Sequence, residues 1–198
     1  ILTLGVYLTF RILDIADLTV EGTFPLGAAV TVVLINTGMS PALAMLCAVL
    51  AGAAAGFVTG FLHTIFKIPA ILSGILTMIA LYSVNIGIMN GASLLNLNNS
   101  DTVFTKMRSV LENTPLAGQY KLIVIIIAVV LVAVVLGLFL RTRLGLAIRA
   151  TGNNPDMVRS SSINPVKTTI IGLCISNAFT ALSGCLLAQS QKSVSIDI

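Results

Sequence analysis

The chain has 198 residues, of which 57% are hydrophobic and 9% are charged, and its mean hydropathy is +1.04. Soluble domains carry about 25% charged residues, so these values exclude an ordinary soluble domain and predict a protein embedded in a lipid bilayer. The net charge of +4 comes largely from one polar loop, without the stacking aromatics of a nucleic-acid groove, so no nucleic-acid partner is expected.

Six apolar runs are candidate membrane spans, since a spanning helix needs about 20 mostly apolar residues. The run at residues 1–13 resembles the end of a helix, and the run at 24–37 is short for a span. The other runs are residues 41–62, 69–89, 122–140 and 168–189. We therefore expect an all-α polytopic membrane protein with about six transmembrane helices, forming a single domain, residues 1–198, that is truncated at both ends.

Three carboxylates, Asp14, Asp17 and Glu21, lie in the polar stretch between the first two runs. Carboxylates at membrane depth are costly and often functional. One interpretation is a broken helix near residues 14–23, whose irregular backbone is buried in protein beside a pathway or gate. The other is a solvated cytoplasmic turn in which Asp17 or Thr19 caps the next helix. The sequence leaves both open.

The spans differ in the side chains they present. Gly52, Gly56 and Gly60 recur every four residues, so they share one helical face on which another helix can approach closely. We therefore expect the run at 41–62 to be interior. The run at 122–140 carries bulky aliphatic residues all round and is expected to face lipid.

Several amides lie within or beside the spans. Asn85 lies in the outer part of the run at 69–89 and Asn90 directly follows it, while Asn177 lies in the run at 168–189. Such groups can line a solute pathway, or they can form interhelical hydrogen bonds worth about 0.6–2 kcal/mol each. Both readings stay open for these residues.

The loop at residues 141–167 is the most basic segment of the chain. Its only acid is Asp156, and its basic residues are Arg141, Arg143, Arg149, Arg159 and Lys167. Basic loops stay on the cytoplasmic side of a membrane, so we place this loop there. The turn at 63–68, with Lys67, and the end of the first run then also face the cytoplasm, and the loop at 90–121 faces outward.

The same loop contains the signals of a short surface helix. Asn154 can cap a helix, and Pro155 fits its first turn. Asp156 follows where the helix dipole favours an anion. The run at 156–163 is about two turns long, so it predicts a helix along the membrane surface and a docking site for another protein. The alternative is an ordinary basic loop.

No catalytic machinery is visible, so the chain is not expected to be an enzyme. A nucleophile triad, a Gly-rich phosphate loop and the Walker pattern are missing from the sequence. Cys47, Cys174 and Cys185 lie in apolar runs, and His63 is the single histidine, so no metal site is expected. No cofactor is expected in this chain, and any ATP would be bound by another polypeptide.

Residues 146–155, LAIRATGNNP, followed by Ser162-Ile163-Asn164, resemble the cytoplasmic loop of permease subunits of bacterial ABC importers. The likeness is to the branched-chain amino acid/ribose permease group, and most of all to its tryptophan/tyrosine-type members. It extends to residues 5–6, 11–14, 17–22, 26–28, 71–78 and 81–85. It covers essentially the whole chain but specifies the solute only weakly.

The resemblance implies a multi-pass subunit of the bacterial inner membrane that moves an amino acid or similar solute by alternating access. Its partners would be an ABC ATPase subunit, an extracytoplasmic substrate-binding protein and a second permease copy in a homodimer. The loop would form a coupling helix that contacts the ATPase through Arg149, Thr151, Gly152, Asn153, Asn154, Pro155, Asp156, Met157, Arg159 and Ile163. Candidate pathway residues are Asp17, Glu21, Asn85, Asn90 and Asn177.

Two other functions stay open. An ion-coupled secondary transporter or channel would act without an ATPase and would use Asp14, Asp17 or Glu21 as its ion or proton site. A membrane scaffold without transport would explain the glycine stripe but leaves the ordered basic loop without a purpose.

Overall fold

The computed structural model describes residues 1–92, 94–97, 102–105, 107 and 119–195. Within them, five helices are long and apolar enough to cross a membrane. These are α2 Thr19–Asn36, α3 Pro41–Thr64, α4 Ala70–Ile88, α6 Tyr120–Arg141 and α9 Pro165–Gln191. The prediction of a helical, polytopic membrane protein is confirmed.

The first predicted span is shorter than the others. It consists of α1, Leu2–Tyr7, continued by a short π-helix, η1, Leu8–Ile12. Two small strands, β1 Leu94–Asn96 and β2 Ser193–Ser195, were not predicted. They pair antiparallel, with Leu94 opposite Ser195, and join the end of α9 to the segment after α4.

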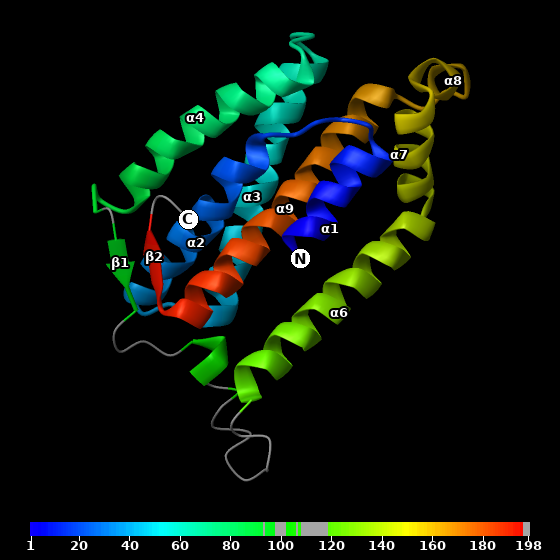
Figure 1. Ribbon diagram of the computed structural model, residues 1–198. Coiled ribbons are helices and arrows are strands. Elements are labelled where there is room, and N and C mark those ends of the chain that lie inside the picture. The colour runs from blue at the N-terminus through cyan, green and yellow to red at the C-terminus, as the bar shows by residue number, and fades with distance from the viewer. Residues whose placement is uncertain (93, 98–101, 106, 108–118, 196–198) are drawn as a thin grey trace.

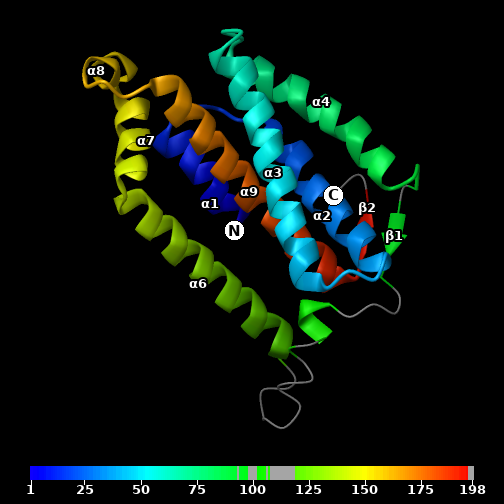
Figure 2. The same cartoon turned by 180° about the vertical axis from the view of Figure 1, so that it is seen from behind.

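Helix α9 is the centre of the bundle. It packs against α2 and α3 on one side and against α1 and η1 on the other, while α4 lies against α2 and α3 (Figures 1 and 2). One apolar cluster joins α2 to the strands through Val32, Leu97 and Val194. A second joins η1, the end of α6 and α7, Arg143–Asn153, through Leu8, Leu140 and Ile148.

The glycine stripe of α3 faces α9, which confirms the predicted close approach of another helix. Helix α3 is not interior as expected, because its opposite face, with Leu46 and Leu50, is exposed. A β-carbon on Gly52 would lie 2.5 Å from that of Ala181, and one on Gly60 would lie 3.1 Å from Cα of Ile170. One on Gly56 would meet the backbone carbonyl of Leu173. The missing side chains therefore let the two helix backbones approach closely.

Helix α6 lies at the side of the bundle (Figure 2). Most of its aliphatic side chains are exposed, including Ile126, Val130 and Leu138. An exposed aliphatic surface of this kind is typical of a contact with lipid or with another chain, so the lipid contact of α6 stays a prediction.

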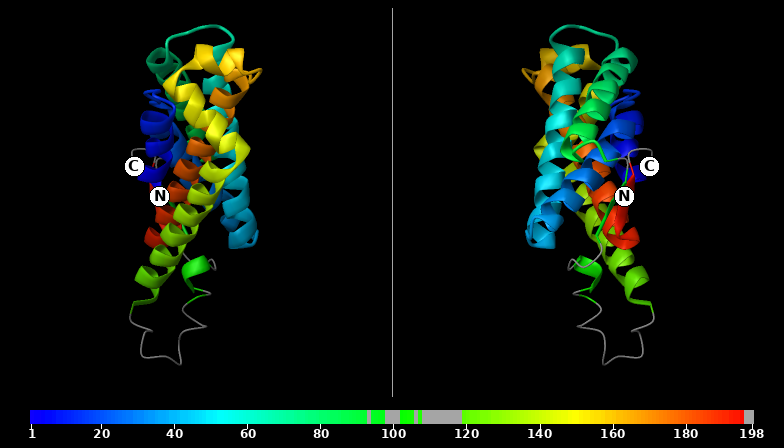
Figure 3. Two further views of the ribbon diagram at one scale, coloured as in Figure 1. Left: turned by 90° about the vertical axis from the view of Figure 1, so that its right-hand side faces the viewer. Right: turned by 90° about the vertical axis from the view of Figure 1, so that its left-hand side faces the viewer.

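The basic segments gather at one end of the molecule. Figure 3 shows the α3–α4 turn, which carries Lys67, at the same end as α7 and α8, Pro155–Ser160. The α2–α3 turn lies at the opposite end. This arrangement agrees with the alternation of sides that the charge pattern predicts.

The break between the first two spans is shorter than predicted. Non-helical backbone occupies residues 13–18, and α2 begins at Thr19 and continues to Asn36. The prediction started this span at residue 24, after the polar stretch that carries Glu21. Glu21 instead lies in the first turn of α2, and Pro25 also lies inside this helix, where it leaves the Glu21 carbonyl without the N–H that an α-helix supplies four residues later.

Candidate solute pathway and coupling surface

Asp17 lies in the break, and both of its carboxylate oxygens are bound. Oδ1 accepts from the backbone N–H of Thr19 at 2.9 Å, and Oδ2 accepts from Nδ2 of Asn177 at 2.8 Å. The Thr23 hydroxyl lies 2.8 Å from Oδ1 of Asn177. The side chains of Asp17 and Asn177 are buried, with 9% and 0% of their surface exposed. These three side chains form a polar cluster between the break, α2 and α9.

A second contact extends this cluster to α3. The hydroxyls of Thr19 and Thr59 are 2.7 Å apart, and Thr19 and Thr23 lie one helical turn apart on α2. Asn177 is close to the middle of α9, which has 27 residues, so the cluster lies deep in the bundle. Thus Asp17 supports the start of α2, as the capping interpretation predicts, and its carboxylate is buried in protein, as the broken-helix interpretation predicts. The break around it is mixed, since Leu13 is buried whereas Asp14 is exposed.

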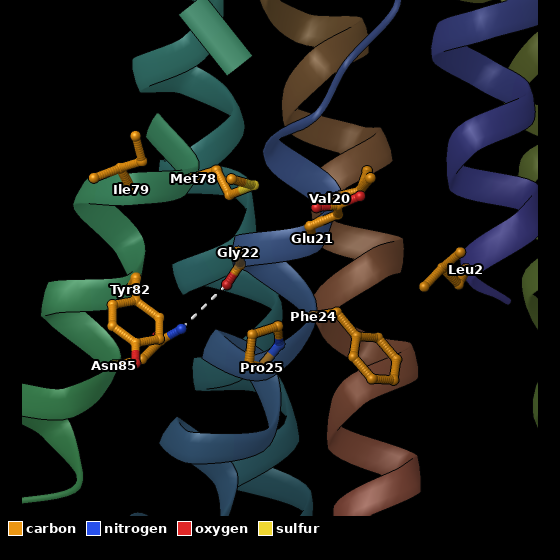
Figure 4. Close-up of a pocket in the computed structure, with 10 residues that line it drawn as sticks. All are labelled: Leu2, Val20, Glu21, Gly22, Phe24, Pro25, Met78, Ile79, Tyr82 and Asn85. Carbon is orange, nitrogen blue, oxygen red and sulfur yellow. Dashed lines mark hydrogen bonds between the residues drawn. The ribbon is translucent and has the colours of Figure 1, made fainter. Parts of the chain in front are cut away.

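A pocket of about 690 Å³ opens beside α2, between α4 and α1 (Figure 4). Its walls are mainly apolar, and its polar side chains are those of Glu21, Tyr82 and Asn85. Glu21 is exposed, whereas Asn85 has 1% of its surface exposed. The ten lining residues are Leu2, Val20, Glu21, Gly22, Phe24, Pro25, Met78, Ile79, Tyr82 and Asn85.

The Asn85 amide is only half satisfied. Its Nδ2 donates to the backbone carbonyl of Gly22 at 3.3 Å, while its Oδ1 is buried without a hydrogen-bond partner among the described residues. The carbonyl of Gly22 can only accept, so this bond fixes which end of the amide faces α2. A buried oxygen without a donor is costly, which makes it an uncommon feature.

The predicted pathway residues therefore separate into three groups. Glu21 and Asn85 share the pocket, and Asp17 and Asn177 share the buried cluster. Asn90 lies apart from both, exposed in the turn after α4 with a φ of 52°.

The predicted surface helix is α8, and its cap is formed by the predicted residue. Oδ1 of Asn154 accepts from the backbone N–H groups of Asp156 and Met157, both at 3.1 Å. The helix ends at Ser160, three residues before the predicted end, because Ser162 takes a left-handed conformation with a φ of 62°. Asn164 then caps α9 by accepting from the N–H of Val166.

Eight of the ten predicted coupling residues are exposed at this end of the molecule: Arg149, Asn153, Asn154, Pro155, Asp156, Met157, Arg159 and Ile163. The other two face inward. The Thr151 hydroxyl lies 2.8 Å from that of Thr168 on α9, and Gly152 lies against the Ile12 carbonyl. Thr151 and Gly152 therefore hold α7 to the bundle rather than presenting a surface to a partner.

All 198 residues match the family described as the permease component of branched-chain amino acid transport systems. The chain belongs to this permease family. The permease is 41% identical over 190 residues to the tyrosine transport system permease protein of Clostridioides difficile (strain R20291), covering 96% of the chain and 60% of that relative. It is 35% identical over 188 residues to an uncharacterized protein of Rickettsia prowazekii (strain Madrid E), covering 95% and 63%.

The permease thus spans about three fifths of each of these relatives. No solved structure matches it significantly. Membership in a transport family, together with the spanning helices, makes it a multi-pass membrane permease and not an enzyme. Among the described residues, no cluster of His, Cys, Asp or Glu could hold a metal ion.

Several residues of these sites were not predicted. Thr59 binds Thr19 from the same helix as the glycine stripe, and Phe24 and Met78 line the pocket of the permease. Thr19 and Thr23 carry a weak signal, a four-residue spacing of hydroxyls on one face of α2. Phe24 and Met78 carry none, because apolar residues in a span look alike in sequence.

Proposed function

We propose that this chain is the permease subunit of a bacterial inner-membrane ABC importer for an amino acid or similar small solute. Its partners would be an ABC ATPase, an extracytoplasmic binding protein and a second copy of the permease. ATP would be bound by the ATPase and no cofactor by this chain. The name of the Clostridioides difficile relative favours an amino acid.

The observation that carries this proposal is the exposed, capped helix α8 at the basic end of a chain that matches the permease family throughout. Met157 is a large apolar side chain of this short helix, and 67% of its surface is exposed. An exposed Met beside Asp156 and Arg159 offers an apolar anchor with a charged rim, which suits a protein interface.

The packing of α7 suggests how movement of α8 would reach the bundle. Gly152 lies against the carbonyl of Ile12, just before the break, and Thr151 contacts Thr168 near the start of α9. A displacement of α8 would therefore act on both the break and the central helix. In alternating access, this displacement would rock α2 and α9 around the solute pathway.

The pathway would include Asp17, Glu21, Asn85, Asn90 and Asn177. Glu21 and Asn85 would meet the solute at the pocket surface. Asp17 and Asn177 would hold the break against α9, deeper in the bundle than the pocket. Asn90 would lie toward the external end.

The test is capture of the partner ATPase by the full-length permease. Met157→Arg should abolish capture, because it places a charge in the centre of the interface. Met39→Arg is the matched control, since Met39 is also an exposed methionine but lies in the α2–α3 turn at the opposite end. Equal capture by both variants and the wild type would contradict α8 as the docking site.

A second candidate function is ion-coupled transport without an ATPase, which is favoured by the exposed carboxylate of Glu21 within a span. Uptake by proteoliposomes separates the two functions. The importer requires ATP with the ATPase and persists when ionophores collapse the ion gradients. The secondary transporter requires a gradient and works without ATP.

A further inference from the structure

A smaller and more polar pocket lies between the end of the first span and α7. Its volume is about 290 Å³, and it is lined by Tyr7, Arg11, Ile12, Arg149 and Asn153. None of these described lining residues is acidic. The pocket is therefore positively charged, because arginine keeps its proton in proteins.

The polar lining comes from two helical segments that lie side by side. Tyr7 and Arg11 are four residues apart at the end of α1 and in η1, and Arg149 and Asn153 are four residues apart on α7. Residues at this spacing are neighbours on one helical face. Each segment thus contributes one guanidinium group and one neutral hydrogen-bonding group to the same space.

Gly152 brings these two segments together. A β-carbon at Gly152 would collide with the carbonyl oxygen of Ile12, so the backbones of η1 and α7 are in close contact. Arg11 directly precedes Ile12, and Asn153 directly follows Gly152. Backbone packing therefore positions the residues that line the pocket.

Two guanidinium groups without an acidic residue in the lining favour an anion. Like charges around a small space repel each other, and an anion between them removes this repulsion. The planar guanidinium group binds the oxygens of phosphate in pairs, which makes arginine a preferred phosphate ligand. The Asn153 amide and the Tyr7 hydroxyl can donate further hydrogen bonds to ligand oxygens.

The pocket lies where the lipid headgroups of the cytoplasmic leaflet are expected. Figure 1 shows α1 beside α7 at the end of the bundle that carries α8, which the positive-inside rule assigns to the cytoplasm. The same two segments expose large apolar side chains, Phe10 on η1 and Leu146 on α7. A ligand here would meet positive charge and apolar surface together. Basic pockets beside spanning helices on this side of a membrane bind anionic headgroups.

We infer that this pocket binds the phosphodiester group of an anionic phospholipid through Arg11 and Arg149. A zwitterionic headgroup fits less well, because its own cation finds no carboxylate in the lining. The bound phosphate ties η1 to α7 and thereby stabilises their contact. This inference goes beyond the proposed function, since it concerns neither the solute nor the α8 surface.

The experiment measures equilibrium binding of short-chain lipids to the full-length permease in an uncharged detergent. Dioctanoyl phosphatidylglycerol is compared with dioctanoyl phosphatidylcholine, which has the same chains and a cationic group. Glycerophosphoglycerol, the first headgroup without its chains, and inorganic phosphate represent soluble sources of phosphate. The wild type should bind phosphatidylglycerol roughly tenfold or more tightly than each of the other probes, because only this lipid supplies both an unopposed negative charge and apolar chains.

The variants assign this preference to the two arginines. Arg11→Gln and Arg149→Gln should each weaken phosphatidylglycerol binding roughly tenfold, whereas Arg11→Lys should retain part of it, because lysine keeps the charge but not the paired contact. Arg143→Gln is the matched control. It removes the same charge from α7 outside the pocket and should bind all four probes as the wild type does.

Three results would overturn the inference. Equal binding of the two lipids would exclude a site for anionic headgroups, and an equal loss in Arg143→Gln would reduce the effect to general attraction by a basic surface. Equally tight binding of either soluble probe would make the ligand a free phosphate compound instead of a lipid.

Two further measurements keep the result decisive. Monodisperse elution identifies the folded variants, and if Arg11→Gln does not fold, the comparison of Arg149→Gln with Arg143→Gln decides. Loss of ATPase capture by Arg149→Gln with unchanged lipid binding would assign this arginine to the ATPase and contradict the lipid site. The proposed function fails separately, when the complete complex shows no ATP-dependent uptake, whatever lipid the permease binds.

Discussion

At the scale of single residues, the Asp17–Asn177–Thr23 cluster is the most constrained part of the molecule. Asn177 donates to Asp17 and accepts from Thr23 with the two ends of one amide. No hydrophobic side chain can replace both functions, and the cluster lies where water is scarce. Each partner therefore depends on the others for its hydrogen bonds.

Asn177→Leu should lower the free energy of unfolding by about 3 kcal/mol, because it leaves one oxygen of the Asp17 carboxylate buried without a donor. Thermal unfolding in detergent micelles measures the loss. The double variant Asp17→Leu with Asn177→Leu should lose less than the sum of the single variants, since no unpaired charge remains. Strictly additive losses would contradict the cluster. Asn153→Leu, at an exposed position of α7, should change stability little.

At the scale of elements, the spacing of small residues correctly predicted that another helix packs closely against α3, and the structure identifies that helix as α9. Gly56 and Gly137 offer a matched comparison. A β-carbon on Gly56 would meet the Leu173 carbonyl, whereas one on Gly137 of α6 would have no neighbour within 4 Å. The same residue type thus has a packing role in one helix and none in the other.

Gly56→Ala should therefore destabilise the protein by about 1–3 kcal/mol, the usual cost of overpacking. Gly137→Ala should leave stability unchanged or raise it by up to about 1 kcal/mol, because alanine favours the helix. Thermal unfolding of the two variants in the same detergent checks both values. Equal effects would show that α3 and α9 are not in close contact.

The sequence predicted the helices better than their ends and partners. Apolar length was enough to find α3, α4, α6 and α9, because each is a long, uniform run. Apolar length did not predict where α2 begins, because the first turn of α2 carries the charged residue Glu21, which lines the pocket. It also missed the β1–β2 pairing, which joins segments far apart in the chain. The sequence marked Asn85 and Asn177 as candidate pathway residues. Only the fold shows that Asn85 lines the pocket and that Asn177 belongs to the buried cluster.

At the scale of the whole molecule, the ends of the bundle differ in charge. Lys67 and Arg149 lie at the end that carries α7 and α8, with Lys167 at the start of α9. The positive-inside rule assigns this end to the cytoplasm. The docking proposal depends on that orientation, because an ATPase can reach α8 only from the cytoplasm.

Orientation can be measured with two cysteines, Met39→Cys and Met157→Cys, after Cys47, Cys174 and Cys185 are replaced by alanine. Both methionines are exposed, Met39 in the α2–α3 turn and Met157 in α8, and Figure 1 shows these two elements at opposite ends of the bundle. A membrane-impermeant maleimide should label Met39→Cys in intact cells, because the α2–α3 turn faces outward. It should label Met157→Cys only after the membrane is permeabilised. The reverse pattern would place α8 outside the cell, where no ATP-driven partner could act on it, and would exclude the importer.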